Sequence, residues 1–208
     1  MFQKYEKDYV SKLTEEVIRN NFKIVAEMEP VAIIRKKVLD RYEGKPNKQI
    51  LDYFKELDKV AISNYGEVLL TRKSADEIVF HSLTSLKAEG LGAIKEVLEN
   101  GKAIYYKTNY KGLDKDRLDI AAPISIEKGQ NKGNYIMAVG VVVTPPSNRV
   151  SLVELAIEKE PYDSTISNQL PTHGSGSSSI LTLLQQVIDV KNGTLSLDQV
   201  TAIGIDSK

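Results

Sequence analysis

Residues 119–158 read DIAAPISIEKGQNKGNYIMAVGVVVTPPSNRVSLVELAIE, and this stretch decides the expected fold class. It contains three apolar, β-branched runs, at residues 120–126, 135–144 and 150–157. Polar segments rich in Gly, Pro and Asn separate the runs, which is the pattern of antiparallel strands joined by hairpins. The stretch therefore predicts a three-stranded antiparallel meander.

Helix-forming segments precede the meander. Residues 4–39 are rich in helix formers and charges, and Thr14 has the side chain of an N-cap. Pro30 is expected to open or interrupt a second helix over residues 31–42. Asn47 is expected to cap a helix whose apolar stripe is Ile50, Leu51, Phe54 and Leu57.

Shorter elements are expected between residues 60 and 108. Residues 60–63 and 67–71 flank Asn64-Tyr65-Gly66 and predict a short hairpin. Ser74 and Glu77 have the spacing of a capping box, so a helix is expected to begin there. A further helix is expected over residues 88–99, and a strand over residues 103–108.

The C-terminal part differs in composition from the rest. Residues 161–179 are rich in Ser, Thr, Pro, Gly and Asn and predict a flexible linker. An amphipathic helix capped by Ser179 is expected to follow, so deletion of residues 161–208 is expected to leave a folded core. The expected fold class is α+β, with N-terminal helices packed on a central antiparallel sheet of about four strands and a tethered C-terminal helix. The expected domain plan is a helical segment (1–46), an α+β domain (47–160), a linker (161–179) and a helical tail (180–208).

Composition excludes several classes of site. The 208 residues include 28 basic and 28 acidic side chains, which argues against a generally basic nucleic-acid coat protein but allows a local basic patch. There is no Cys and only two His residues, so no disulfide, metal site or cofactor is expected. The first residues lack the apolar core of a signal peptide, and no apolar run approaches the roughly 20 residues of a membrane helix.

His81 is the first candidate for chemistry. It lies near the end of a predicted helix, and histidine is the side chain most easily tuned for proton transfer near neutral pH. The alternative is a structural histidine whose charged form meets the helix dipole.

Residues 102–117, KAIYYKTNYKGLDKDR, interleave five cations with three tyrosines. Single-stranded nucleic acid is bound by cations on its phosphates and aromatic faces on its bases. The alternative is a solvated strand and loop whose tyrosines pack partly on the sheet.

Asn148 and Arg149 at the last turn form the third candidate, with Glu154 on the following strand. Arg149 has the geometry to hold a phosphate, and Glu154 can act as a base or pair with a lysine. The alternative is an ordinary polar turn.

The order of several motifs resembles the phage and mobile-element toxin-like domains of the barnase–EndoU–colicin–RelE nuclease superfamily. The resemblance covers roughly residues 50–158, and its motifs are His81-Ser82 after a helix, AIKEVLENG (93–101), YKTNYKG (106–112), IAAPISI (120–126), YIMAVGVVV (135–143) and Asn148-Arg149. It implies a four-stranded antiparallel sheet and metal-independent RNA cleavage. By position, His81 and Arg149 fall on family motif residues, whereas Val153 stands where the family usually has a histidine.

The resemblance also assigns expected roles. Proton carriers and charge-stabilising groups are expected among His81, Tyr106, Arg149 and Glu154, and the residues expected to bind RNA phosphates are Lys87, Lys107, Asn109, Lys111 and Arg117. The implied partners are RNA, with tRNA as one candidate, and an immunity protein, but no membrane and no small-molecule cofactor. The implied location is the cytoplasm of a bacterial host or a phage particle. The alternative function is a non-catalytic phage-protein module for partner binding or particle assembly.

Overall fold

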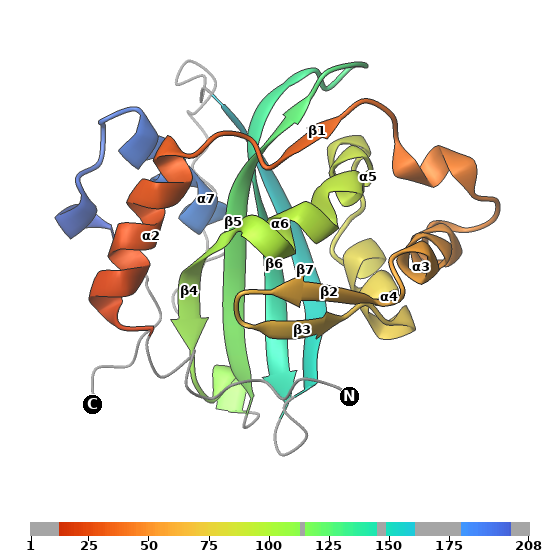
Figure 1. Ribbon diagram of the computed structural model, residues 1–208, viewed down its shortest axis with the longest axis horizontal. Coiled ribbons are helices and arrows are strands. Elements are labelled where there is room, and N and C mark those ends of the chain that lie inside the picture. The colour runs from red at the N-terminus through yellow and green to blue at the C-terminus, as the bar shows by residue number, and fades with distance from the viewer. Residues whose placement is uncertain (1–12, 113–114, 145–148, 161–179, 201–208) are drawn as a thin grey trace.

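The computed structural model describes residues 13–112, 115–144, 149–160 and 180–200 (Figure 1). The expected linker over residues 161–179 lies outside these ranges. So do Ser179, the expected cap of the C-terminal helix, and Asn148 in the last turn. The helices are α2 (Glu15–Glu27), η1 (Val38–Arg41), α3 (Pro46–Glu56), α4 (Arg72–Phe80), α5 (Ser85–Gly90), η2 (Leu91–Ala93), α6 (Ile94–Asn100), η3 (Tyr110–Gly112), α7 (Ile180–Lys191) and η4 (Leu197–Gln199). The strands are β1 (Ala32–Ile34), β2 (Val60–Ser63), β3 (Gly66–Leu69), β4 (Lys102–Lys107), β5 (Asp116–Ile126), β6 (Gly133–Thr144) and β7 (Arg149–Glu160).

The predicted meander is confirmed. Strands β5, β6 and β7 pair antiparallel over nearly their whole lengths, from Asp116 opposite Val143 to Ile126 opposite Gly133 on one side of β6. The three strands are long and rich in β-branched residues, which pack well on a pleated surface. They form the centre of the sheet.

The expected sheet of about four antiparallel strands is wrong. Over the described residues the sheet is mixed and has seven strands in the order β1-β5-β6-β7-β3-β2, with β4 also paired to β5. Strand β1 runs parallel to β5, and β3 runs parallel to β7. The predicted hairpin is confirmed as β2 and β3, but its parallel pairing with β7 was not expected. Strand β1 has only three residues, too few for a periodic pattern, and long-range pairing brings it to the sheet.

The helix expected over residues 31–42 is also absent. Its first part is β1, where Val31 N–H donates to the Pro123 carbonyl at 2.9 Å, and its second part is the short helix η1. The run VAII has the β-branched side chains of a strand, so pairing with β5 overrides the helical propensity of the charged residues that follow.

The sheet curls, and the β2–β3 hairpin comes to lie in front of β5 and β6 in Figure 1. Tyr65, in the hairpin turn, reaches across to β4, where its hydroxyl accepts a 2.8 Å hydrogen bond from the Ala103 N–H. This contact joins two parts of the sheet that do not pair as strands.

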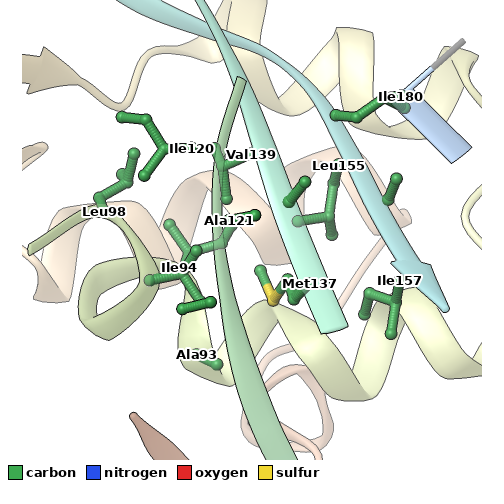
Figure 2. Close-up of a cluster of buried hydrophobic side chains, with 14 of the residues drawn as sticks. Ala93, Ile94, Leu98, Ile120, Ala121, Met137, Val139, Leu155, Ile157 and Ile180 are labelled. Carbon is green, nitrogen blue, oxygen red and sulfur yellow. The ribbon is translucent and has the colours of Figure 1, made fainter. Parts of the chain in front are cut away.

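Both faces of the central strands are buried. Helix α6 packs in the curl, where Ile94 and Leu98 lie near Ile120 and Val139 (Figure 2). Ile136, which points to the opposite face from Val139, is equally buried. Helices α2 and α7 pack together on that second side, and α7 also contacts β6 and β7.

Two helix starts illustrate what local sequence predicts. Thr14 caps α2 as expected, because its hydroxyl accepts from the Val17 N–H at 3.2 Å. The capping box expected from Ser74 to Glu77 is wrong. Thr71 is the N-cap of α4 instead, and Ser74 is the third helical residue that completes the box. Helix α4 therefore starts one turn earlier than expected.

Candidate active site

Arg117 on β5 is the centre of a buried polar network. Its side chain is only 9% exposed, yet each nitrogen of its guanidinium has an oxygen partner. Nε donates to Asp119 Oδ1 at 2.8 Å, Nη2 to Glu154 Oε2 at 2.7 Å, and Nη1 to the Tyr110 hydroxyl at 2.9 Å. We call Tyr110, Arg117, Asp119 and Glu154 the Arg117 cluster.

Strand register brings the two carboxylates of the cluster together. Asp119 on β5 and Glu154 on β7 both lie opposite Gly140 on β6. A Cβ atom on Gly140 would lie 2.9 Å from Asp119 Oδ1 and 3.1 Å from Arg117 Nη2. Gly140 is therefore the residue that leaves room for the ion pairs to cross the middle strand.

A β-bulge adjoins Glu154. Gly140 pairs with Glu154 but Val141 pairs with Leu152, which leaves Val153 as the extra residue on β7. Bulges re-aim the side chains beside them. The position at which the resembled family usually has histidine is thus the bulge residue next to Glu154.

The loop after β4 covers the other side of Arg117. Tyr110 N–H donates to the Lys115 carbonyl at 2.6 Å, and Lys111 has a left-handed backbone with φ of 56°. The Tyr110 ring centroid lies 5.1 Å from Arg117 Cζ and 5.2 Å from Lys111 Nζ. Both cations are within the range of cation–π attraction, so the ring helps to hold them.

Asp119 and Glu154 differ in how deeply their carboxylates are buried. Burial raises the pKa of Asp119 to about 6, although Arg117 favours its charged form. Burial alone would lower the pKa of Arg117, but Asp119 and Glu154 raise it above its ordinary value, so the guanidinium stays charged. The Glu154 side chain is 24% exposed against 2% for Asp119, so Glu154 is the carboxylate that a ligand can reach.

Lys87 on α5 connects the cluster to the end of α4. Burial lowers the pKa of Lys87, and the charge of Glu154 opposes this effect. The Lys87 amine also donates to the His81 carbonyl at 2.9 Å. One lysine thereby links two of the predicted catalytic residues.

His81 is the C-cap of α4, as expected for a histidine at a helix end. Its side chain is 42% exposed, and Nε2 lies 3.7 Å from Glu77 Oε2, one turn earlier in the helix. The imidazole is therefore accessible, although it makes this contact with its own helix rather than with the Arg117 cluster.

Two other predicted site residues, Tyr106 and Lys107, lie on β4. Tyr106 pairs with Leu118, so it points to the face opposite Arg117, and its hydroxyl donates to Asp116 at 3.4 Å. Burial, followed by the charge of Asp116, raises its pKa. Lys107 pairs with Arg117 and shares the face of the cluster.

Asn109 and Lys111 belong to the loop that carries Tyr110, and both have positive φ. Arg149 is the first residue of β7 and pairs with Thr144, but its side chain lies outside the described part of the structure. The predicted residues in direct contact are therefore Arg117 and Glu154 and, separately, Lys87 and the backbone carbonyl of His81.

Sequence reasoning missed Asp119 and Gly140 as members of the site, and it included Tyr110 only as one of the tyrosines of residues 102–117 expected to stack on bases. Two signals were present. Asp119 is an isolated charge in an apolar strand, two residues from Arg117 and so on the same face, and Gly140 interrupts a run of valines. Neither signal shows that the two residues lie side by side, because that depends on the register.

A cleft of about 760 Å³ lies elsewhere, between residues 31–41 and the helices α3 and α6. Its basic lining residues include Arg35, Lys37 and Arg41, which already pair with carboxylates of Glu127, Glu89 and Glu56. None of the predicted catalytic residues is among its described lining residues.

Within the described ranges, no group of three or more His, Asp or Glu side chains is arranged to hold a metal ion. The helices in the same ranges include none that is both long and apolar enough to cross a membrane. No protein-family model, curated protein or solved structure matches this chain.

Proposed function

We propose that the chain is a metal-independent endoribonuclease that uses Glu154 as its proton acceptor. The observation that carries the proposal is the Glu154 carboxylate itself. It is a quarter exposed, and one of its oxygens is held 2.7 Å from the buried guanidinium of Arg117. A fixed, accessible carboxylate beside a cation has the geometry of a general base next to a phosphate site.

The reaction needs only proton transfer and charge stabilisation. Glu154 takes the proton of a ribose 2′-hydroxyl, and the 2′-oxygen attacks the adjacent phosphorus. The bond from phosphorus to the 5′-oxygen breaks, which leaves a 2′,3′-cyclic phosphate, and the 5′-oxygen takes a proton from the side chain of His81. Lys87 stabilises the negative charge on the phosphorane oxygens.

Arg117 has a positioning role in this proposal. Its side chain is 9% exposed and its nitrogens are bonded to Asp119, Glu154 and Tyr110, so it orients Glu154. Lys107 shares its sheet face and is half-buried, which suits contact with a neighbouring phosphate.

The test is cleavage of a fluorescently labelled single-stranded RNA oligonucleotide in the presence of EDTA. Glu154→Gln is expected to lower the cleavage rate about 10²–10⁴-fold, the usual contribution of a general base. Glu158→Gln is the matched control, because Glu158 lies on the same strand and face and is also partly buried. An oligonucleotide of the same sequence in DNA is expected to remain intact, since it lacks the 2′-hydroxyl.

Equal activity of the Glu154→Gln variant and the parent would remove Glu154 from the reaction. Activity that disappears in EDTA and returns with a divalent cation would show that the cleavage depends on a metal.

A second function, a non-catalytic module that binds a partner, is favoured by one observation. Arg117 already donates hydrogen bonds to the carboxylates of Asp119 and Glu154, which leaves it less able to bind a phosphate. Val153 also occupies the bulge position where the resembled family has histidine. A parent chain that leaves RNA intact while remaining folded would support this second function.

A further inference from the structure

Phe80 is exposed in a way that its packing does not explain. Its relative exposure is 81%, whereas Phe22 and Phe54 are fully buried. Large aromatic side chains dominate the energy of cores and interfaces because they bury so much surface. A phenylalanine that stands in solvent at the end of a helix therefore has most of its ring surface available to a ligand.

The ring does not stand alone. It meets the His81 ring edge to face, with centroids 5.4 Å apart and planes at 82°. Ser82, with φ of 63°, then reverses the chain, and the Lys87 amine returns to the His81 carbonyl at 2.9 Å. An exposed aromatic ring, an accessible imidazole and the Lys87 amine thus lie together at the end of α4.

We propose that Phe80 is a nucleobase-binding subsite, on which one base of single-stranded RNA stacks next to the phosphate held by Lys87. This inference rests on the proposed function, because it takes RNA as the ligand of the same site. Every base has a π-face, so stacking on a single exposed ring favours unpaired bases of any sequence. The subsite consequently selects single-stranded over double-stranded RNA, whose bases are covered by their neighbours in the helix.

Binding is measured with a 2′-O-methyl oligonucleotide, which has no free 2′-hydroxyl and is not cleaved. The expected result, by fluorescence anisotropy with a labelled hexamer, is that Phe80→Ala raises Kd roughly 5- to 150-fold, the range for loss of one stacked base. Phe80→Trp is expected to retain tight binding. Ile62→Ala is the matched control, since Ile62 is an apolar residue that is 53% exposed on strand β2, outside residues 80–87.

An oligonucleotide with abasic positions separates stacking from other effects. The parent is expected to bind the abasic oligonucleotide as weakly as the Phe80→Ala variant binds the intact hexamer. The Phe80→Ala variant is expected to bind the abasic oligonucleotide no more weakly than the parent does. Equal loss on both oligonucleotides would overturn the subsite, because the lost contact would then not be a base. Failure of the parent to bind the intact hexamer would overturn it as well.

These measurements also separate the subsite from the catalytic proposal. If the parent fails to cleave RNA but its binding still depends on Phe80 and on the base, the subsite stands and only the chemistry assigned to Glu154 is wrong.

Discussion

Arg117 and Glu154 are 37 positions apart in the sequence, and Nη2 of one lies 2.7 Å from Oε2 of the other, across the glycine at position 140. The pair connects β5 to β7 over the middle strand β6. Because Arg117 also bonds the buried carboxylate of Asp119, the same guanidinium stabilises the sheet and orients the accessible carboxylate. Stability and activity are therefore expected to respond together to changes at Arg117.

Replacing Arg117 by Met removes the charge and keeps the length of the side chain. The change leaves the buried Asp119 without its cation, and breaking a buried ion pair in this way costs about 3–5 kcal/mol. Urea unfolding at pH 7 measures the loss. The double variant Arg117→Met with Asp119→Leu is expected to recover much of it, because no unpaired charge then remains in the core. A single variant as stable as the parent would show that Asp119 is neutral at that pH.

The contribution of Asp119 to the free energy of unfolding should fall as pH rises from about 4 to 7. Its pKa is raised in the folded protein from 3.8 to about 6, so between these values the folded state holds a proton that the unfolded state has released. The folded state is then favoured at the acid end, and the contribution is lost as pH passes the folded pKa. The loss is on the order of 3 kcal/mol.

The measurement is the free energy of unfolding of the parent and of Asp119→Asn at several pH values in this range. The difference between the two, rather than either curve, isolates Asp119 from the other carboxylates. A difference that does not change with pH would mean that Asp119 does not titrate between 4 and 7.

Gly140→Ala tests the close approach of three side chains over β6. The new methyl group would lie 2.9 Å from Asp119 Oδ1 and 3.2 Å from Glu154 Cβ, so the ion pairs must move apart. Overpacking of this kind costs about 1–3 kcal/mol, and we expect RNA cleavage to fall with it because Glu154 is displaced. Gly92→Ala is the control, since its nearest neighbour would be a Val38 carbon at 4.0 Å. Thermal unfolding and the cleavage assay report the two effects, and equal values for both variants would contradict the argument.

The parts of the fold that could be predicted are those with local signals. Strands β5, β6 and β7 are long and β-branched, and the segments between them carry turn residues, so pattern alone identified the meander. Strand β1 has three residues, and what makes it a strand is a partner some 90 positions away, at Ile124 to Ile126. No local pattern contains that information, and the helical propensity of its neighbours pointed the other way.

The candidate site, too, could be predicted only where local sequence contains the signal. The residue types of Lys87, Arg117 and Glu154 suggested their chemistry, but their contacts depend on the register of three strands and on one bulge. For the same reason Arg117 was expected to bind phosphate, whereas its burial fits a positioning role better. Asp119 had no assigned role, because the partner that gives it one is fixed only when β5 pairs with β6.

The packing of the C-terminal helix α7 reverses the expected outcome of deleting it. From composition, deletion of residues 161–208 is expected to leave a folded core. In the structure, however, α7 is part of the core, with Ile180, Leu183, Leu184, Val187 and Ile188 all buried. Burial of each large apolar side chain contributes about 1.5–3 kcal/mol, so we now expect the truncated chain to lose most of its stability.

Leu184→Ala is the point substitution that tests the same packing without removing any chain. Leu184 is fully buried, and the substitution is expected to cost about 2–5 kcal/mol through lost contacts and the cavity left behind. Leu181→Ala on the same helix is the control, because Leu181 is 44% exposed and should change stability little. Thermal unfolding followed by circular dichroism compares both variants with the parent and with the truncated chain. Equal melting temperatures for Leu184→Ala and Leu181→Ala would show that α7 does not pack on β6 and β7 in solution, and the helix would then be the tethered appendage that the composition suggests.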